Sequence, residues 1–380
     1  MESERLAITC GGTGGHFYPG LTIAREQKAR GRQVILLLSG INSDVQAKIA
    51  GSCGIDCCIL PHMPHWKKSP LKFGRGLFGG ISQSYRKLKE FKPDALLGMG
   101  SFASLPPIIG AKLLQIPVFL HDGNARIGKA NRILSRAARH LAVAFDPVNQ
   151  KKVKCPCTVT GMPVRPELLK NSHLDKTECI ARINQLFSVK LSTELPTILV
   201  FGGSQGAEKF NQCFPEAFKR NQGCRFQVIH LTGKGKLSET KRLYENCTFP
   251  RLIIESSEEM QFFLGAGDLV ICRSGGSSIA ELMIFGCPAI LIPYFYAAEG
   301  HQQDNADFLT SRDAAICINN QELTQNTAEE QIRKFLDQPE YYRQLGINAE
   351  KLAKPEAAQT ILDLIGREIQ SMKSKRSPVS

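Results

Sequence analysis

Short apolar runs alternate with longer amphipathic segments along the whole chain. In the first half the runs predict strands at residues 6–10, 34–38, 95–98, 118–121 and 140–144. In the second half they predict strands at residues 197–201, 227–231, 252–254, 269–272 and 289–292. Strands separated by helical patterns are typical of a parallel sheet with helices on both faces. We therefore predict an α/β fold of doubly wound parallel sheets.

The pattern begins twice, and each time a glycine-rich run follows the first strand. The chain has 380 residues, more than one ordinary core holds, which predicts two Rossmann-like domains facing each other across a cleft. Prolines and a glycine between residues 155 and 166 indicate the crossover. We expect domains at 1–162 and 163–354, a C-terminal helix at about 355–372 that packs back on the first domain, and a disordered tail at 373–380.

The first glycine-rich run, "TCGGTGGHFYPG", joins a strand to a helix predicted from Pro19 to Lys28 with the proline in its first turn. A loop with few side chains lets a ligand approach the backbone, and the following helix N-terminus favours an anion. A tight turn without a ligand is the alternative. His16 closes the run with an imidazole, which suits acid–base chemistry near neutral pH.

Another glycine-rich turn, "CRSGGSSIAELMIFG", follows the strand that ends at Cys272. Its glycines and serines present amides and hydroxyls at the N-terminus of a helix predicted at residues 279–285, and Glu281 lies one turn in. A phosphate at the helix start and a carboxylate near two hydroxyls would suit a nucleotide with an intact ribose. Alternatively, Glu281 only stabilises the first helical turn.

Charge indicates an anionic partner, because 48 Lys and Arg against 35 Asp and Glu leave a net charge of +13. Between Pro61 and Pro93 a basic and apolar segment has Glu90 as its only acid. Its members are Lys67, Lys68, Lys72, Arg75, Arg86, Lys87, Lys89 and Lys92 with Trp66, Leu71, Phe73, Leu77, Phe78 and Ile81. The mixture favours an anionic membrane surface over a solvated basic loop, and no nucleic-acid-binding pattern accompanies it.

Neither a spanning apolar stretch nor a signal peptide is evident, so we expect a cytosolic protein. The 13 cysteines are odd in number and scattered, which favours small buried thiols over a zinc site or a disulfide framework.

Seven motifs occur in an order that resembles the MurG family of bacterial glycosyltransferases. They are "GGTGGHFYPG", "GMGSFAS", "HDGN", "GMPVRPE", "GGSQGA", "CRSGGSSIAE" and "HQQDNA". The resemblance implies a two-domain GT-B enzyme that moves N-acetylglucosamine from UDP-GlcNAc to undecaprenyl-pyrophosphoryl-MurNAc-pentapeptide (lipid I), inverting the anomeric centre and giving lipid II and UDP. It also implies no cofactor, no essential metal, peripheral attachment to the cytoplasmic face of the cell membrane, and other cell-wall assembly proteins as partners.

On the donor side, the resemblance carries substrate-binding roles to Arg165, Ser204, Gln205, Ser257, Gly276, Ser277, Ser278, Glu281, Gln302 and Gln303. The serines match the diphosphate site, Glu281 the ribose carboxylate, and Gln302 and Gln303 the contacts to the sugar. Ser257 matches a backbone position that contacts the uracil.

The resemblance assigns Gly11, Gly12, His121 and Asp122 to the acceptor side of the site. The resemblance also counts Thr13, Gly14, Gly15 and Asn124 among the residues that bind UDP-GlcNAc. Thr13, Gly14 and Gly15 would meet the lipid I pyrophosphate and the reacting sugars, and Asn124 would contact the acceptor or the donor sugar. His16 would be the base that receives the proton of the attacking MurNAc 4-hydroxyl, or would only orient its loop.

Two motifs depart from the family pattern. His121-Asp122-Gly123-Asn124 stands where the family usually has a Glu-Gln pair, and Ser101-Phe102 where it has glycine and tyrosine. A related GT-B transferase acting on another lipid, such as diacylglycerol, and a non-catalytic sugar-nucleotide-binding scaffold are the alternative functions.

Overall fold

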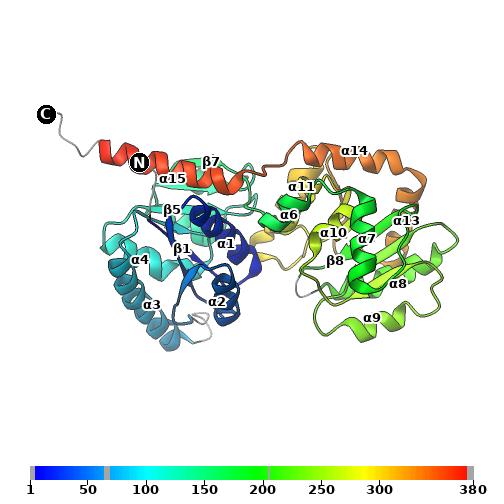
Figure 1. Cartoon of the computed structure of the whole chain (residues 1–380), viewed down its shortest axis with the longest axis horizontal. Coiled ribbons are helices and arrows are strands. Elements are labelled where there is room, and N and C mark those ends of the chain that lie inside the picture. The colour runs from blue at the N-terminus through cyan, green and yellow to red at the C-terminus, as the bar shows by residue number, and fades with distance from the viewer. Residues whose placement is uncertain (1–4, 64–68, 204–205, 375–380) are drawn as a thin grey trace. The chain divides into compact units, whose positions relative to one another are not determined.

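The computed structural model describes residues 5–63, 69–203 and 206–374, and the chain divides into two compact units. The first unit comprises residues 1–165 and 354–380, and the second comprises residues 166–353 (Figure 1). The division falls between Arg165 and Pro166, and the chain returns to the first unit at Lys354.

The first unit contains a seven-stranded parallel sheet with the order β3-β2-β1-β4-β5-β6-β7. Its strands are β1 (Arg5–Cys10), β2 (Gln33–Leu38), β3 (Asp56–Ile59), β4 (Ala95–Gly98), β5 (Val118–Asp122), β6 (His140–Val143) and β7 (Cys157–Val159). Ala7 of β1 pairs with Ile35 on one side and Leu96 on the other. The carboxyl ends of all these strands therefore share one edge.

Helices cover both faces of this sheet. They are α1 (Gly14–Ala29), α2 (Ser43–Ser52), α3 (Pro70–Phe91), α4 (Leu105–Leu113), α5 (Lys129–Leu134) and α15 (Ala357–Ser374). Leu6 and Ile8 of β1 pack with α1, α2 and α15, whereas Ala7 between them packs with α3, α4 and α5. Successive strand residues point to opposite faces, so one buried strand supports both cores.

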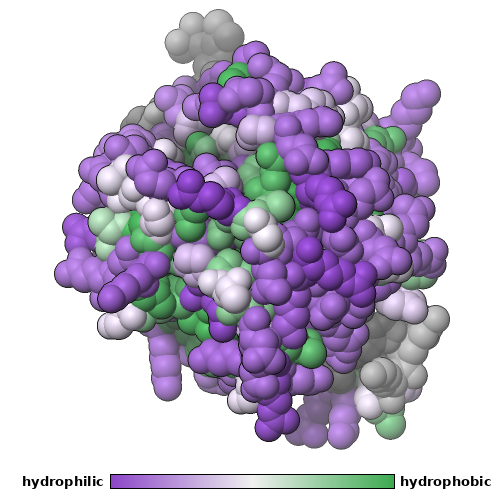
Figure 2. Space-filling model, turned by 90° about the vertical axis from the view of Figure 1, so that its right-hand side faces the viewer, coloured by the Kyte–Doolittle hydropathy of each residue, from purple (hydrophilic) through white to green (hydrophobic). Residues whose placement is uncertain are grey.

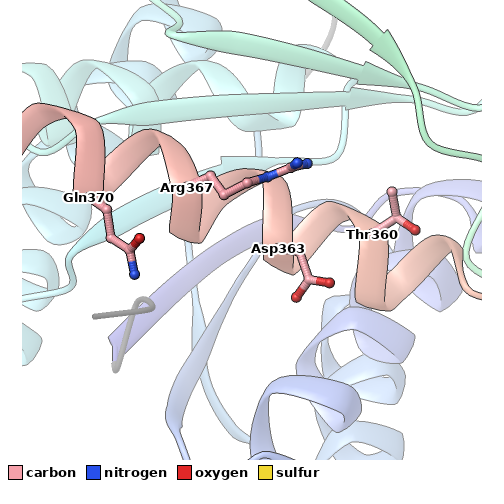
Figure 3. Close-up of a pocket in the computed structure, with 4 residues that line it drawn as sticks. All are labelled: Thr360, Asp363, Arg367 and Gln370. Carbon is pink, nitrogen blue, oxygen red and sulfur yellow. The ribbon is translucent and has the colours of Figure 1, made fainter.

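The C-terminal helix α15 lies against α1, and an ion pair of 2.6 Å joins Arg30 to Asp363. A polar pocket of about 390 Å³ lies along one side of α15 and is lined by Thr360, Asp363, Arg367 and Gln370 (Figure 3). Because the Asp363 carboxylate already binds Arg30, we assign this pocket to the packing of α15 rather than to a substrate.

The second unit contains a six-stranded parallel sheet with the order β10-β9-β8-β11-β12-β13. Its strands are β8 (Thr197–Phe201), β9 (Gln227–Leu231), β10 (Arg251–Ile254), β11 (Leu269–Cys272), β12 (Ala289–Leu291) and β13 (Ile316–Cys317). The two units therefore repeat one architecture, with the first strand of each in the interior of its sheet.

The helices of the second unit are α6 (Pro166–Asn171), α7 (Lys176–Phe187), α8 (Glu208–Arg220), α9 (Leu237–Leu243), α10 (Met260–Ala266), α11 (Gly276–Phe285), α12 (His301–Thr310), α13 (Gln325–Asp337) and α14 (Pro339–Glu350). Short 3-10 helices lie at Phe102–Ser104, Gln150–Lys152 and Ala298–Gly300 of the chain. Ile198 and Val200 of β8 point into an aromatic core under α8 and α13, and Leu199 between them faces the side of α10.

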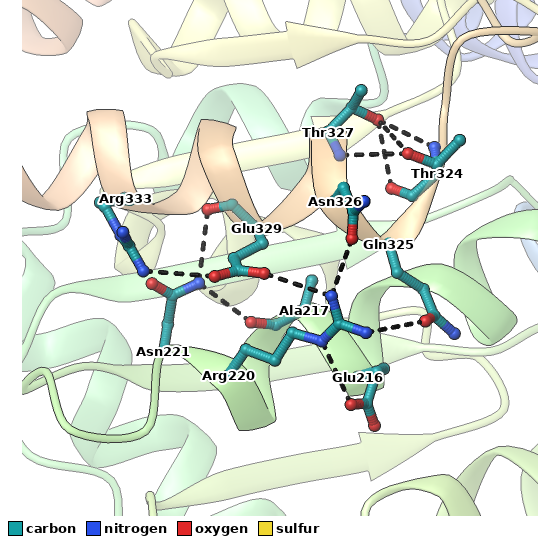
Figure 4. Close-up of polar contacts among 10 residues, drawn as sticks. All are labelled: Glu216, Ala217, Arg220, Asn221, Thr324, Gln325, Asn326, Thr327, Glu329 and Arg333. Atoms are coloured by element: carbon teal, nitrogen blue, oxygen red, sulfur yellow. Dashed lines mark hydrogen bonds and ion pairs between the residues drawn. The ribbon is translucent and has the colours of Figure 1, made fainter.

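Polar side chains join α8 to α13 at the surface. Arg220 binds Glu216 on its own helix and Glu329, Asn326 and Gln325 on α13, and Thr324 caps that helix (Figure 4). The end of the second unit that lies on the right in Figure 1 is mainly hydrophilic (Figure 2). This is the pattern expected of helices that turn their apolar sides to the core.

The predicted fold class is confirmed, and each of the ten predicted strands occurs within one residue of its expected ends or closer. The structure adds β3, β7 and β13, of which β7 lies in the stretch that we interpreted as a crossover. All three are edge strands and are only partly buried. An edge strand has one sheet neighbour and need not have the continuous apolar run of a central strand, although the edge strand β10 is apolar enough to be predicted.

Two further expectations need correction. The tail was expected to begin at residue 373, but α15 includes Lys373 and Ser374, and Lys373 lies 3.4 Å from Asp94. The cysteines are all free thiols, but only Cys10, Cys179, Cys213, Cys272 and Cys287 are buried. Within the described ranges, no helix combines the length and apolar character needed to cross a bilayer.

Candidate active site

The first unit has a reversal of strand order at its centre. From β1 the chain proceeds outward to β2 and β3, then returns to place β4 and β5 on the opposite side of β1. In open parallel sheets, the crevice at the carboxyl edge beside such a reversal is the usual ligand site. The segments that begin at the ends of β1, β4 and β5 meet here. They include Gly11 to His16, Ser101-Phe102, and the last two residues of β5, His121 and Asp122, with the following Gly123-Asn124.

The glycine run after β1 is a short loop followed directly by the first turn of α1. Gly11 and Gly12 have φ angles of 129° and 80°, and a Cβ on Gly11 would lie 2.6 Å from the Ser39 carbonyl oxygen. Only glycine fits this approach without strain. Thr13 is the N-cap, and it is exposed together with Gly14 and Gly15.

The expected start of this helix at Pro19 was wrong, because α1 begins at Gly14 and Pro19 lies inside it. Proline is frequent in first turns, but here it lies in the second, where it removes one backbone hydrogen bond without ending the helix. Gly14, Gly15 and His16 therefore belong to the positively polarised end of α1, where backbone amides face outward.

His16 is held by the loop after β4. Its Nδ1 lies 2.9 Å from the Met99 carbonyl oxygen. A carbonyl only accepts, so Nδ1 carries the hydrogen and the neutral ring has its lone pair on Nε2. Gly100, at φ 91°, lies against the ring, and a Cβ there would be 3.3 Å from His16 Cε1. The loop thus sets the tautomer that a general base needs.

The Asp122 carboxylate organises its own loop. It accepts hydrogen bonds from the amides of Gly128 (2.8 Å) and Asn124 (3.2 Å) and from the Asn131 side chain (2.9 Å). Asn131 also donates to the His121 carbonyl at 2.9 Å and is buried. Asn131 was not predicted, because nothing in its local sequence marks it.

His121 is buried on β5, and its Nε2 lies 3.2 Å from the Gly161 carbonyl oxygen. Burial lowers the pKa of His121, and the charge of His16 contributes in the same direction. His121 therefore joins β5 to the segment after β7. The guanidinium of Arg165, at the end of the first of the unit's two segments, lies 5.3 Å from the Tyr18 ring centre of α1.

The second unit repeats the reversal between β8 and β11. The loop after β11 leads directly into α11, which begins at Gly276 and not at Ile279 as expected. Ser277 and Ser278 are therefore in the first turn of this helix, with Gly275 as the N-cap. Because Ser277 and Ser278 are polar, the apolar periodicity of the sequence placed the start of this helix too late.

The Ser277 hydroxyl oxygen is buried and has no hydrogen-bond partner among the described atoms. A buried hydroxyl without a partner costs free energy, which a ligand oxygen would recover. Its place at the start of a ten-residue helix suits an anion. Glu281 is half-buried in the next turn.

Ser274 joins the first turns of α11 and α12. Its hydroxyl donates to the Gln302 carbonyl at 2.7 Å, and its own carbonyl accepts from the buried Asn305 side chain at 2.9 Å. The Gln302 side-chain oxygen accepts from the Tyr294 amide at 2.8 Å. Gln303 donates to Asp307 at 2.8 Å. Both helix starts and the loop after β12 are thus held as one body.

Arg273 at the end of β11 was missed by the sequence analysis. Its guanidinium donates to the Ile292 carbonyl at 2.9 Å and to the Asn320 side chain at 2.6 Å, and it lies 4.6 Å from the Phe210 ring centre. Burial lowers the pKa of Arg273. It supports the loop that carries the exposed rings of Tyr294, Phe295 and Tyr296.

The remaining predicted site residues are dispersed or not described. The Ser257 hydroxyl accepts from the Glu259 amide at 3.0 Å, just before α10. Ser204 and Gln205 lie outside the described residues. Among the residues that the structure does describe, no group of three or more His, Cys, Asp or Glu side chains is arranged to hold a metal ion.

The predicted membrane segment, between Pro61 and Pro93, includes the whole of α3. Leu71 and Phe78 are 90% and 74% exposed, and Lys72 and Arg75 are exposed beside them. Phe73, Leu77 and Ile81 are only half-buried, and Trp66, Lys67 and Lys68 lie outside the described residues. The buried side of α3 is Gly76, Gly80, Ser84 and Leu88, whose spacing of four places them in one row.

Two parallel-sheet units, each with loops at a strand-order reversal, are the architecture of the two-domain GT-B fold. Residues 6–143 match the glycosyltransferase family 28 N-terminal domain, and residues 197–361 match the glycosyltransferase family 28 C-terminal domain. The chain therefore belongs to glycosyltransferase family 28 and, within it, to the MurG family.

The relatives that it resembles match at least 94% of the chain. It is 34% identical, over 95% of the chain and 98% of the relative, to the UDP-N-acetylglucosamine–N-acetylmuramyl-(pentapeptide) pyrophosphoryl-undecaprenol N-acetylglucosamine transferase of Desulforamulus reducens. The transferase of that name from Geobacter sulfurreducens is 33% identical, over 94% of this chain and 97% of its own. The crystal structure of Acinetobacter baumannii MurG is similar, with 25% identity, a TM-score of 0.75, and coverage of 96% of this chain and 99% of that one. The resemblance drawn from the motifs is confirmed.

Proposed function

We propose that this protein transfers N-acetylglucosamine from UDP-GlcNAc to the MurNAc 4-hydroxyl of lipid I, giving lipid II and UDP with inversion at the anomeric carbon. The observation that carries the proposal is the likeness, along 95% of the chain, to relatives that are named as this transferase. The motifs that follow β1, β4 and β11 also lie where each parallel sheet has its strand-order reversal.

The donor diphosphate binds at the start of α11 in this proposal. The buried Ser277 hydroxyl supports the assignment, because it has no hydrogen-bond partner among the described atoms and lies in the helix's first turn. Ser278 and the Gly276 amide complete the phosphate site, and Glu281 in the next turn accepts from the ribose hydroxyls. Gln302 and Gln303 at the start of α12 contact the sugar, and Arg165, Ser204, Gln205 and Ser257 contribute as the family resemblance implies.

His16 is the general base in this proposal. As MurNAc O4 forms its bond to the anomeric carbon, Nε2 of His16 takes the hydroxyl proton, and the bond from that carbon to UDP breaks. The Met99 carbonyl oxygen, 2.9 Å from Nδ1, supports this role, because it fixes the neutral tautomer in which Nε2 carries the lone pair. Negative charge leaves with UDP, and the helix N-terminus of α11 stabilises it.

The acceptor binds at the start of α1 and at the loops beside it in this proposal. Thr13, Gly14 and Gly15 are exposed at the positive helix end, which suits the lipid I pyrophosphate. Asp122 shapes the loop that carries Asn124, since its carboxylate accepts three hydrogen bonds from that loop and the following helix. The exposed apolar and basic side chains of α3 rest on the anionic cytoplasmic surface of the cell membrane.

The test is an incubation of the full chain with UDP-GlcNAc and either lipid I or diacylglycerol. UDP release is followed by a coupled assay, and the lipid product is identified by mass spectrometry. We expect UDP release and a lipid II product with lipid I only. Transfer to diacylglycerol instead would indicate a related lipid glycosyltransferase. UDP-GlcNAc binding without any product would indicate a non-catalytic scaffold.

A further inference from the structure

A chain of buried polar side chains crosses the interior of the second unit. The Tyr244 hydroxyl lies 2.8 Å from Nδ1 of His230, and Nε2 of His230 lies 3.0 Å from the Asn211 side-chain oxygen. The Asn211 side-chain nitrogen lies 3.0 Å from the Thr232 carbonyl oxygen. All four residues are at most 5% exposed, so water does not substitute for any of these partners.

The hydrogen bonds of this chain run in one direction. The Thr232 carbonyl only accepts, so the Asn211 nitrogen faces it and the Asn211 oxygen faces His230. His230 must then donate from Nε2, and its Nδ1 accepts from the Tyr244 hydroxyl. Burial lowers the pKa of His230 to about 3, which keeps the ring in this neutral form. One arrangement alone satisfies every group.

The chain ends at the carboxyl edge of the sheet. Thr232 follows β9, and its carbonyl also meets Gly206, where an added Cβ would collide with that oxygen and lie 2.8 Å from Gly233 Cα. Gly206 belongs to the glycine-rich segment after β8, and Asn211 is in the first turn of α8. The Thr232 carbonyl is therefore the point at which Gly206 and the first turn of α8 are fixed to the end of β9.

We propose that Tyr244, His230 and Asn211 are positioning residues for the UDP portion of the donor, holding Gly206 and the first turn of α8 against the end of β9. This inference rests on the proposed function. A shift of α8 along β9 would break two hydrogen bonds between buried groups, so the relay resists such a shift. The backbone amides at the start of α8 then keep one position whether or not the donor is bound.

The test compares UDP binding and kinetics of His230→Leu, which removes both hydrogen bonds, with His230→Gln, whose amide can still donate to Asn211. Gln227→Leu is the matched control. Gln227 is fully buried on the same strand and binds Ser192 and Thr197, but at the amino end, away from the glycine-rich segment. Thermal unfolding shows whether the two leucine variants are destabilised alike.

We expect His230→Leu to raise the calorimetric Kd for UDP and the KM for UDP-GlcNAc about tenfold, with the KM for lipid I changed less than about twofold. His230→Gln should recover most of the loss, and Gln227→Leu should leave the Kd for UDP unchanged. Should His230→Leu fail to fold, Tyr244→Phe removes one hydroxyl and is expected to raise the Kd for UDP about threefold.

The proposal is overturned if the folded His230 and Tyr244 variants bind UDP as the parent does, or if Gln227→Leu weakens UDP binding equally. Failure of the parent protein to bind UDP would instead refute the proposed function. The two failures are therefore distinguished within the same series of titrations.

Discussion

At the residue scale, the contrast between His16 and His230 shows how surroundings assign roles to one side chain. His16 is half-buried at the start of α1 and donates from Nδ1 to the Met99 carbonyl. His230 is fully buried and donates from Nε2 to Asn211. Opposite tautomers result, because in each case a neighbouring acceptor selects the nitrogen that carries hydrogen. Of these two histidines, only His16 is accessible enough for a substrate to contact its ring.

The depressed pKa of His230 predicts acid sensitivity. An unfolded histidine titrates near 6.5, whereas burial lowers the folded pKa to about 3. Stability is therefore complete above about pH 6.5 and falls toward pH 3 by about 1.4 kcal/mol per pH unit, since only the unfolded chain gains the proton. Between about pH 7.5 and pH 5.5, the parent should lose about 1.4 kcal/mol more unfolding free energy than His230→Gln in urea titrations followed by circular dichroism. Equal losses would contradict the assignment.

Glu281 provides a test of the donor site. We expect Glu281→Ala to weaken UDP binding, because a charge-assisted hydrogen bond to the ribose is lost. The cost is about 1.5 to 3 kcal/mol, or roughly ten- to a hundredfold in affinity. Calorimetry with UDP measures it, and the KM for lipid I should change little. Unaltered UDP binding would show that Glu281 only stabilises α11.

At the element scale, the small residues of α3 decide which side of this helix packs. A Cβ on Gly80 would lie 3.0 Å from Pro106 Cβ of α4, and one on Gly110 would lie 3.4 Å from the Ser84 side chain. Gly80 and Ser84 thus let α3 and α4 approach closely, whereas Gly76 in the same row lies against the backbone of His62, before α3. Leu71 and Phe78 are left exposed on the other side, beside Lys72 and Arg75.

This arrangement predicts that replacing Lys72 and Arg75 with serine weakens sedimentation with phosphatidylglycerol vesicles about tenfold or more, at about 1 kcal/mol for each charge near the surface. The residual binding should depend less on salt. Activity on a short-chain, detergent-soluble lipid I analogue should stay nearly intact. The matched control replaces Lys241 and Arg242, which are exposed on α9 in the other unit, and should bind vesicles like the parent. If the variant of Lys72 and Arg75 also binds vesicles like the parent, the exposed side of α3 is a solvated basic surface.

At the scale of the whole molecule, two similar units carry different chemical groups at corresponding edges. The first places an imidazole and an exposed helix start after β1, and the second places serines and a carboxylate after β11. This division suits an acceptor on one unit and a nucleotide on the other. In each unit, the negative charge of a bound phosphate group would face a helix N-terminus.

We therefore predict that turnover persists when EDTA removes divalent ions, since backbone dipoles and hydroxyls meet the leaving diphosphate. Initial rates with UDP-GlcNAc and lipid I, measured with and without the chelator, should agree within about twofold. A complete loss that is restored only by adding a divalent ion would refute this view of the site.

Local pattern alone determined the central strands and the apolar edge strand β10, the two-unit organisation and the glycine-rich loops. A strand with neighbours on both sides must be apolar along its length, and a backbone at a φ of 129°, as at Gly11, favours glycine wherever it occurs. Each of these features depends on a few consecutive residues, so a short stretch of sequence is enough to predict it. They also located His16, Ser277 and Glu281 beside those loops.

Only the tertiary structure decided the features that depend on distant residues. The edge strands β3, β7 and β13 form because a neighbouring strand provides hydrogen bonds, not because their own residues are strongly apolar. Asn131, Arg273 and His230 look ordinary in the sequence, and each gains its role from groups brought near it by folding. Burial and hydrogen-bond partners are properties of the packed molecule, so no short window of sequence contains them.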